Sequence, residues 1–575
     1  MEPTFLMPAI DALLVLQRSD VTPLAARREE LGTTKMLFVD PGTLDAAIQA
    51  GLGHYELRRL EISRDLPAEV YSEALNRATL IDRLLSAERS ALWAAGVGDD
   101  TPFTGWDQML LYLSMQRAFM ARAIGRCVAR QFPESRIGLL RPDNAQLMHF
   151  DSMLSAEMAL VDPTRLFFVD RYEGVRFHNP QITSLIWHPQ ALARQVQEQG
   201  ADAVVHIPTC FYDAATYGAA IRQRFASILD LPGTYCDVPV HRPQPLLTPM
   251  ADLPPQAIDA SALRYRERAL AVFTDQLAAW IPHRAALHQQ AELWAQRSQQ
   301  QALNYLALRQ ALQGRQPHFV VCDHDTGMNG PLYSVAAQLG SRITVLPHSG
   351  YATSALPHAR GVTAIERVGF GAGVRSALGQ PVPVRAVRFR SKPEAQGREA
   401  ASRVCLLLNT MQSEGIAHVD FFALVAFYKR LAALCSTHGA DLQVRLKPST
   451  PALNVVAGAF GQPPGWFQRC FGRPVEEVAV EADLTIAYGE MTSGVVTFLD
   501  AASLVLHVSE QHWPADTLIT PPFIRDGLIA SQGGEPALAD VAVLLSDAVA
   551  YRSRQSRQSL AYARRGRAAH DTFFD

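Results

Sequence analysis

Short apolar runs separated by polar turns recur along the chain. In the first 250 residues, four such runs start at positions 35, 135, 165 and 203, with the sequences KMLFVD, SRIGLL, RLFFVD and AVVHIP. Stretches with helical spacing lie between them, including a long one around residues 106–130. Because short apolar runs are typical of buried parallel strands, their alternation with helices predicts an α/β fold with a mainly parallel sheet.

The second half of the chain continues this alternation. Residues 257–315 are strongly helical, and residues 318–351 contain a strand, an acidic turn, a helix, a second strand and a polar turn, which is a complete βαβ unit. Residues 385–402 are charged and poor in apolar positions, so we expect a domain boundary there. After it, the runs VCLLLNT, LQVRLKPS and DLTIAY predict three more strands.

The simplest architecture is a pair of Rossmann-like parallel-sheet domains that face a central cleft. The first domain is expected to span residues 1–385, with helical insertions at 70–130 and 257–315. The second is expected to span residues 400–545, and residues 546–575 to form a closing basic helix or tail.

Composition narrows the class of protein. Of the 575 residues, 48% are hydrophobic, and the net charge of -3 argues against nucleic-acid binding driven by bulk charge. The seven cysteines are scattered without a CxxC pair, which is typical of reduced thiols rather than of a disulfide framework or a zinc site. The chain starts without a basic leader and has no apolar run near the roughly 20 residues of a membrane span. We therefore expect a cytoplasmic protein.

Polar loops follow the three strands expected after residue 400. Since the carboxyl ends of parallel strands lie at one edge of a sheet, where open α/β sheets bind ligands, these loops should form one crevice. The turn Gly489–Gly494 precedes a helix, and free N–H groups at a helix start favour a bound anion. The candidate ligand-binding residues are Thr410, Glu414, Lys447, Ser449, Glu490, Thr492, Ser493 and Gly494.

The residue types in this crevice suit a ligand that carries both phosphate and sugar. Lys447 can pair with a phosphate as a point charge, and Thr492 and Ser493 can donate hydrogen bonds to it. Glu490 can accept from a sugar or ribose hydroxyl. Each loop taken alone is equally consistent with an ordinary helix cap or turn.

A second group of candidates lies in the first predicted domain. Asp323 and Asp325 follow the strand FVVC, and His348 follows the strand ITVL, so acids and an imidazole can meet at one sheet edge. Asp325 or Asp323 is a candidate general base or nucleophile, with His348 as base, phosphate ligand or orienting group. A helix cap at Asp325 and a backbone-bonded turn at His348 are the structural alternatives. No third ligand has diagnostic spacing, so no metal is predicted.

Two earlier strand ends add candidates for an acceptor pocket, Arg141 and Asp170, although charged residues are common at strand ends without a function. Motifs of other enzyme classes are missing from the sequence. It has no GxxxxGK[ST] loop, no GxGxxG after the first strand and no GxSxG elbow. Kinase, nicotinamide-dependent dehydrogenase and α/β-hydrolase activities are therefore not expected.

Several of these motifs together resemble those of bacterial GT-B glycosyltransferases of capsule and lipopolysaccharide biosynthesis. The segments LNTMQSEG, RLKPS and ADLTIAYGEMTSGVVTFLDA carry the resemblance over residues 404–545. Lys447 and Pro448 match a KPHP loop in which Ser449 replaces the histidine, and Asp500 replaces a late glutamate. The turn PHSGY is similar to the family's PHG turn with Ser349 inserted. The most similar subgroup uses CMP-activated acidic sugars such as Kdo or sialic acid.

The resemblance implies a metal-independent glycosyltransferase with the nucleotide-sugar as co-substrate and no resident cofactor. It places the donor phosphate on Thr492 and Ser493, and the saccharide or lipid-linked glycan acceptor on the N-terminal domain. Asp325 and His348 are the candidate catalytic pair. The protein would work in the cytoplasm, either free or peripheral to the inner membrane through its Arg-rich C-terminus. A nucleotide-sugar epimerase on the same fold and a non-catalytic sugar-binding scaffold of envelope assembly are the alternatives.

Overall fold

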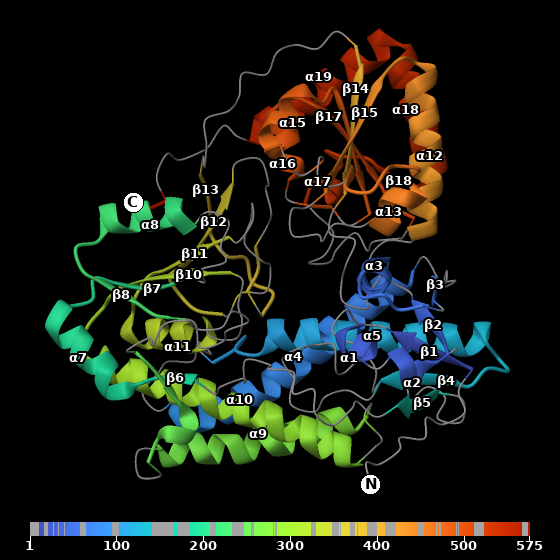
Figure 1. Cartoon of the computed structure of the whole chain (residues 1–575). Helices are drawn as coiled ribbons and strands as arrows, with labels where there is room; N and C mark the ends of the chain where they lie inside the picture. The colour runs from blue at the N-terminus through green and yellow to red at the C-terminus, as the bar shows by residue number, and fades with distance from the viewer. Residues whose placement is uncertain are drawn as a thin grey trace.

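We analysed a computed structural model of the whole chain (Figure 1). The structure describes residues 11–15, 21–26, 28–32, 34–38, 41–53, 55–57, 65–94, 103–140, 166–169, 185–207, 214–232, 246–254, 258–279, 281, 284–323, 329–347, 356, 358–367, 374–376, 378–387, 400–408, 421–446, 454–466, 470, 473–489, 491–492, 494–510, 522–565 and 573–574.

The first sheet contains five described strands, all parallel, in the order β3-β2-β1-β4-β5. They are β1 (Ala12–Val15), β2 (Lys35–Phe38), β3 (Tyr55–Leu57), β4 (Ile137–Leu140) and β5 (Leu166–Val169). Every residue of β1 is buried, as expected of a central strand covered on both faces. Three short helices pack on one face: α1 (Val21–Ala26), α2 (Arg28–Leu31) and α3 (Pro41–Gln49).

The second sheet contains six described strands, again all parallel, in the order β13-β12-β11-β10-β7-β8. They are β7 (Ala203–His206), β8 (Ile228–Asp230), β10 (His318–Cys322), β11 (Ile343–Leu346), β12 (Val362–Arg367) and β13 (Val384–Val387). One face packs on α7 (Pro189–Gln199), α10 (Arg284–Ala311) and α11 (Asn329–Leu339), and the other on α8 (Ala214–Arg224). Beside it lie the antiparallel pair β6 (Leu185–Trp187) and β9 (Leu247–Pro249) and the 3-10 turn η2 (Met250–Asp252).

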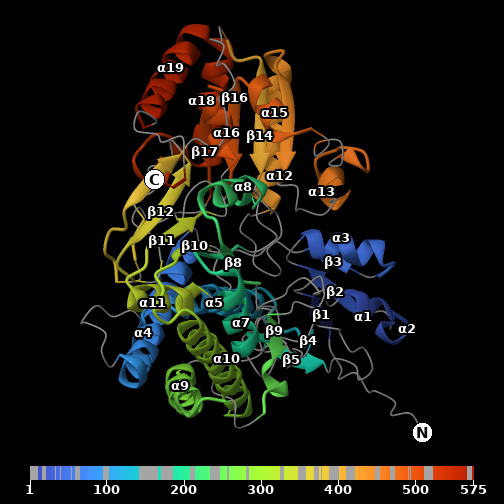
Figure 2. The ribbon, with the colours of Figure 1, turned by 90° about the vertical axis from the view of Figure 1, so that its left-hand side faces the viewer.

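The third sheet has the order β15-β14-β16-β17-β18 and is also parallel throughout its described strands. These are β14 (Arg403–Leu408), β15 (Asp441–Leu446), β16 (Leu484–Tyr488), β17 (Leu504–Val508) and β18 (Ser531–Gln532). The helices around it are α12 (Phe421–Thr437), α13 (Asn454–Ala459), α15 (Val475–Glu481), α16 (Val495–Asp500), α17 (Pro522–Arg525), α18 (Gly534–Ser546) and α19 (Ala548–Arg565). Helix α13 contacts α3 of the first sheet, as both views show (Figures 1 and 2).

The α/β class with parallel sheets is confirmed, but residues 1–385 hold two sheets where the sequence pattern suggested one domain. The apolar run of β5 and that of β7 fall in different sheets although they are neighbours in the sequence pattern. Alternation of strands and helices indicates that a sheet is parallel, but it does not say which consecutive strands are hydrogen-bonded to each other.

Three long helices join the first two sheets: α4 (Leu66–Trp93), α9 (Ala260–Ala278) and α10. A fourth, α5 (Gln108–Gln131), packs on α4 in the core of the first sheet. Helix α4 contributes Val70 to the core of the first sheet and Trp93 to that of the second. Helix α9 likewise contributes Phe273 to the first and Tyr265 to the second. The helical segments that the sequence pattern placed as insertions thus form a shared support for both sheets.

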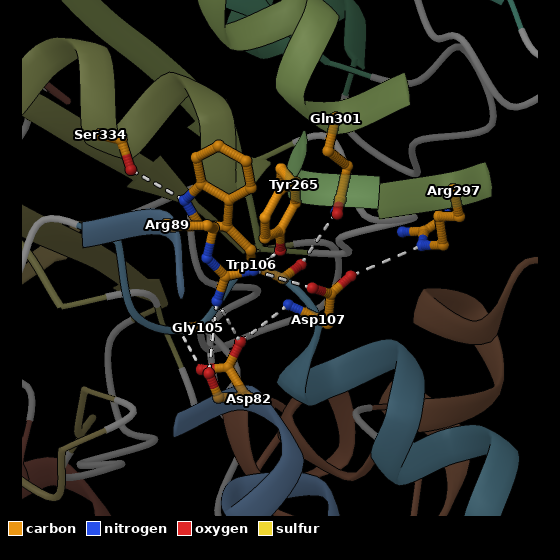
Figure 3. A network of polar contacts seen from close by, with 9 residues as sticks. All are labelled: Asp82, Arg89, Gly105, Trp106, Asp107, Tyr265, Arg297, Gln301 and Ser334. Atoms are coloured by element: carbon orange, nitrogen blue, oxygen red, sulfur yellow. Dashed lines mark hydrogen bonds and ion pairs between the residues drawn. The ribbon is translucent and has the colours of Figure 1, made fainter. Parts of the chain in front are cut away.

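A buried charge network lies where this helical support meets the second sheet (Figure 3). Arg89 is fully buried, and its guanidinium donates to Asp82 Oδ1 and Asp107 Oδ2, each at 2.9 Å. It also donates to the Tyr265 hydroxyl at 3.0 Å, and its Cζ lies 4.8 Å from the Trp106 ring centroid. Burial alone would lower the pKa of Arg89, but Tyr265, Asp82 and Asp107 outweigh it and raise that pKa, so the guanidinium stays charged.

Trp106 connects this network to α11. Its indole N–H donates to Ser334 Oγ at 2.8 Å, and its carbonyl accepts from the Gln301 amide at 3.2 Å. A Cβ on Gly330 would lie 2.6 Å from the Cα, Cγ and Cδ1 atoms of Trp106. Glycine at position 330 therefore allows α11 to pack directly against Trp106.

The end of the described chain returns to the second sheet. Phe573 and Phe574 pack beside α8 on the face opposite α10 and α11. The Phe573 ring meets Tyr217 edge-on, with 5.3 Å between centroids, and the Phe574 ring meets Phe225 in the same way at 5.4 Å. These two residues, which follow α19 of the third sheet in sequence, contribute to the core of the second.

Candidate functional site

The carboxyl ends of three adjacent strands are level in the third sheet. Leu408, the last residue of β14, pairs with Leu446 at the end of β15 and with Tyr488 at the end of β16. The three loops expected from the sequence to form one crevice therefore start at the same edge of the sheet, so that placement is confirmed. Six of the candidates lie in these loops outside the described residues: Thr410, Glu414, Lys447, Ser449, Glu490 and Ser493.

Thr492 and Gly494 show how the third loop turns into α16. The Gly494 N–H donates to Thr492 Oγ1 at 3.2 Å, and the Val495 N–H donates to the Thr492 carbonyl at 3.1 Å. Two N–H groups in front of the helix are thus bonded within the turn. The Thr492 hydroxyl proton can still be donated to a ligand, because Oγ1 is the acceptor in the first of these bonds.

His507, which the sequence analysis did not single out, holds the start of the same loop. It lies in β17, is 1% exposed, and its Nε2 contacts the carbonyl oxygen of Gly489 at 2.6 Å. Its Nδ1 lies 2.7 Å from Ser531 Oγ. Burial lowers the pKa of His507, against the opposing bond to Gly489, so the imidazole is neutral at pH 7. A neutral ring that donates from Nε2 to a carbonyl must accept at Nδ1, so Ser531 is the donor there.

The backbone conformation at position 489 favours glycine. Its φ of +77° lies in the left-handed region, and its N–H donates to the Val508 carbonyl at 2.8 Å. Both backbone polar groups of Gly489 are therefore bonded to β17. The sequence signal for the contact between His507 and Gly489 is a histidine inside the apolar run SLVLHV. Histidines in such runs often lie in the core without a special role, so this one was not predicted to matter.

The carboxyl edge of the second sheet brings together the turns of the second group of candidates. Cys322 at the end of β10 pairs with Leu346 at the end of β11, so the turns that begin with Asp323 and Pro347 start side by side. Asp323 is 3% exposed, and its N–H donates to the Leu346 carbonyl at 2.9 Å. The Cys322 thiol lies 3.5 Å from Asp323 Oδ1. Asp325 and His348 lie in these turns, outside the described residues.

Two more titratable groups, not identified from the sequence, end strands of this sheet. His206 at the end of β7 pairs in register with Val321 of β10, is 3% exposed, and its Nδ1 lies 3.0 Å from the Leu231 carbonyl. Partial desolvation raises the pKa of the Asp230 carboxyl at the end of β8, and nearby His206 opposes that shift. The sequence shows that His206 and Asp230 follow apolar runs. It does not show that β7 and β8 pair side by side, which is what brings the two residues near each other.

In the sequence, Arg141 and Asp170 come directly after two strands of the first sheet, whereas Asp323 comes after a strand of the second. They follow Leu140 and Val169, which pair in register at the ends of β4 and β5. Both positions lie outside the described residues. The acceptor-side candidates and the catalytic candidates therefore follow strands of two different sheets.

The described parts of the chain contain no group of three or more His, Cys, Asp or Glu side chains placed to hold a metal ion. Nor do they contain a helix that is both long and apolar enough to cross a bilayer.

No family model matches the sequence, and no curated protein matches it. Solved structures with some likeness include a glycotransferase of kitacinnamycin (14% identity, covering 66% of this chain and 92% of that one, TM-score 0.31). Another is a UDP-forming α,α-trehalose-phosphate synthase from Burkholderia vietnamiensis (12% identity, 63% and 93% covered, TM-score 0.32). This chain spans 59% of a chain of the GtfA/B complex (11% identity, 45% of this chain covered, TM-score 0.26). The fold class stated above comes from the strand topology.

Proposed function

We propose that the protein is a GT-B-type glycosyltransferase that moves a sugar from a nucleotide-activated donor to a saccharide or lipid-linked acceptor in bacterial surface polysaccharide assembly. The observation that carries the proposal is the level ending of β14, β15 and β16, with a hydroxyl-, lysine- or acid-bearing loop after each. Ligands of open parallel sheets bind at this edge.

The donor would bind at the third sheet. Lys447, Ser493 and the free proton of the Thr492 hydroxyl would hold the donor phosphate, with no requirement for a metal, because fixed cationic and hydroxyl groups stabilise a leaving phosphate. Glu490 would accept from a ribose or sugar hydroxyl. Our proposal for the donor class is a CMP-activated acidic sugar such as Kdo, on the basis of the RLKPS and YGEMTSG segments.

The chemistry would take place between the second and third sheets. In a direct displacement, Asp325 would take the proton of the acceptor hydroxyl, the acceptor oxygen would bond to the anomeric carbon, and the bond from that carbon to the phosphate oxygen would break. In a double displacement, the Asp325 carboxylate would bond to the anomeric carbon as the bond from that carbon to the phosphate oxygen breaks. The acceptor oxygen, losing its proton to His348, would then displace Asp325 from the same carbon. His348 and Asp323 would assist as base or orienting groups. Arg141 and Asp170 would contact the acceptor.

Ligand-dependent thermal stabilisation tests the donor site. CMP-, UDP- and GDP-sugars should be compared, and we expect the largest shift with a CMP-sugar. Replacing both Thr492 and Ser493 by Ala should weaken nucleotide binding by about 2–4 kcal/mol, the loss of two charge-assisted hydrogen bonds. Thr437→Ala is a matched control, because this exposed threonine bonds only within α12. Unchanged nucleotide affinity in the double variant would place the donor elsewhere.

The catalytic assignment has its own test. Asp325→Asn should abolish transfer and leave nucleotide binding intact. Near-normal turnover in this variant would remove Asp325 from the reaction. Conversion of one UDP-sugar into another without any acceptor would support an epimerase instead, and no thermal shift with any nucleotide would support a scaffold.

We also propose that α19 contacts an anionic membrane surface. The helix contains five arginines and no acid, and Arg552, Arg557 and Arg564 are exposed. Val549 and Leu560 on the same helix are 67% and 52% exposed.

Flotation with phosphatidylglycerol-containing vesicles should recover the protein, and flotation with phosphatidylcholine vesicles should not. Changing the three exposed arginines to Gln should weaken binding by about 3 kcal/mol, since each basic residue near such a surface contributes about 1 kcal/mol. A variant that carries Arg194→Gln, Arg264→Gln and Arg315→Gln is the charge-matched control, as these arginines are exposed on other helices and turns. Equal loss of binding in both variants would contradict the assignment to α19.

A further inference from the structure

Tyr217 joins the end of the chain to the turn that follows β11. It lies in α8, is 1% exposed, and its hydroxyl donates to the carbonyl oxygen of Pro347 at 3.0 Å. Pro347 is buried and directly precedes His348. On its other side, the Tyr217 ring meets the Phe573 ring edge-on. One tyrosine thus contacts both the returning end of the chain and the backbone of a candidate catalytic turn.

The returning residues complete a core that α8 covers in part. The cluster on this face includes Val320, Leu346 and Ile365 from three central strands, and among the described helices α8 contributes to it. Parallel strands require cover on both faces. Phe573 and Phe574 are half-buried against this cluster and supply apolar surface beside α8. Their removal would expose part of the face and take away the edge-on contact between Phe573 and the Tyr217 ring.

The bond to Pro347 fixes the direction of the Pro347 carbonyl. A proline has a fixed φ and no N–H, so the remaining backbone freedom at this residue is the rotation that aims its carbonyl. The Tyr217 hydroxyl is buried and can donate to the Pro347 carbonyl in one orientation of that carbonyl. The bond therefore sets the direction in which the backbone leaves Pro347. An unbonded buried carbonyl is unfavourable, so the turn would shift toward another donor or toward water if the Tyr217 hydroxyl were removed.

We propose that Tyr217 is a positioning residue for the backbone at Pro347, the residue before His348, and that Phe573 keeps Tyr217 in place. The returning end of the chain therefore acts on the candidate catalytic turn, through one ring contact and one hydrogen bond. The catalytic consequence of this coupling rests on the proposed transferase function, but the coupling itself does not.

Hydrogen exchange measured by mass spectrometry tests the coupling without any substrate. The variants are Tyr217→Phe, which retains the ring and loses the hydroxyl, and a chain that ends at residue 572. Tyr562→Phe is the matched control, because this buried tyrosine of α19 donates to Asp500 of α16 at 2.8 Å, beside the third sheet. We expect Tyr217→Phe and the shortened chain each to speed exchange at least tenfold in peptides covering residues 343–356, and Tyr562→Phe to leave those peptides unchanged.

The pattern of exchange decides the outcome. Faster exchange confined to α8 in the shortened chain would mean that Phe573 and Phe574 only cover the sheet, and it would overturn the coupling. Unchanged exchange in residues 343–356 of Tyr217→Phe would overturn the positioning role. A Phe573→Ala variant gives a second test with a single side chain changed, in case the shortened chain folds poorly.

An activity measurement then separates this proposal from the proposed function. With a CMP-sugar donor, Tyr217→Phe should lower kcat about tenfold and leave the Kd for CMP unchanged, because the nucleotide would bind at the third sheet. The combined Tyr217→Phe and Phe573→Ala variant should lose no more than Tyr217→Phe alone, since Phe573 would act on the turn only through the hydroxyl that Tyr217→Phe removes. If the protein transfers no sugar, the exchange data still decide whether the coupling exists.

Discussion

The imidazole of His507 holds the main-chain carbonyl of Gly489 at 2.6 Å, and thereby ties the loop after β16 to β17. The loop that begins at Gly489 contains Glu490, Thr492 and Ser493, the proposed donor-binding residues. A buried, neutral histidine acts here as a fixed link between two strand ends. It has no surface from which it could touch a ligand.

Replacement of His507 by Leu should weaken nucleotide binding as well as destabilise the fold. The change leaves the Gly489 carbonyl without this donor and the Ser531 hydroxyl without this acceptor, at a cost of about 1–3 kcal/mol for each group that stays buried and unpaired. Calorimetry with CMP should show an affinity loss of tenfold or more. His438→Leu, on the surface of the same domain, is the control. Equal affinities in both variants would show that the Gly489 link does not shape the site.

Arg89→Met should destabilise the protein strongly. The substitution leaves the Asp82 and Asp107 carboxylates buried without their shared counter-charge, and breaking such a buried pair costs about 3–5 kcal/mol. We expect the apparent Tm to fall by on the order of 10 °C. Arg268→Met removes an exposed partner of Glu88 and should cost less than about 1 kcal/mol. Similar melting temperatures for the two variants would contradict the role of the network in joining the helical support to the second sheet.

Gly330→Ala should disturb Trp106 and, through it, α11. A methyl group placed 2.6 Å from the Trp106 backbone and ring requires movement of main chain, which costs about 1–3 kcal/mol or more. The intrinsic fluorescence of Trp106 and Trp93, which stack with 6.3 Å between ring centroids, should change with it. Gly458→Ala in α13 has nothing within 4 Å of the added methyl and should be neutral or slightly stabilising. No loss of stability in Gly330→Ala would mean that α11 can move away freely.

Acid should loosen the docking of Phe574. Burial, together with the cations Arg342 and Arg224, lowers the pKa of His318 from 6.5 to about 4. The His318 ring packs against Phe225 and Phe574, and its Nε2 lies 2.8 Å from Thr344 Oγ1. Below pH 6.5 the unfolded chain takes up a proton that the folded protein resists down to about pH 4, so stability decreases as pH falls through this range.

The comparison of His318→Gln with the parent chain measures this effect. Between pH 6.5 and 4, the Tm of the parent should fall more steeply than that of the variant, and exchange in α8 should rise with it. His438→Gln, at an exposed position, should follow the parent. Parallel curves for the parent and His318→Gln would show that this imidazole contributes nothing to the acid response.

Three adjacent strands of the third sheet could be predicted from the sequence, because strands and helices alternate there without interruption. VCLLLNT, LQVRLKPS and DLTIAY became β14, β15 and β16, and their turns lie where parallel-strand geometry places them. In the N-terminal half, the strands were found but their grouping was not. The long helices α4, α9 and α10 contribute to the cores of both sheets, and nothing in their apolar spacing says that one end belongs to a different core from the other.

Residues that act through long-range contacts were the ones that sequence reasoning missed. Tyr217 and Pro347 are 130 positions apart, and Arg89 and Tyr265 are 176 apart. His507 lies in an apolar run where a histidine has no special meaning until its partner at Gly489 is known. Such contacts are created by packing, so neither residue spacing nor local composition indicates them.

The return of Phe573 and Phe574 to the second sheet changes how the second and third sheets can move relative to each other. The chain leaves the second sheet after β13, enters the third at β14, and comes back after α19, so two passages of chain connect the two bodies. A body attached at one point can swing and twist in any direction. A body attached at two points rotates mainly about the line through both points. Movement of the third sheet and its helices relative to the second sheet therefore has a preferred axis.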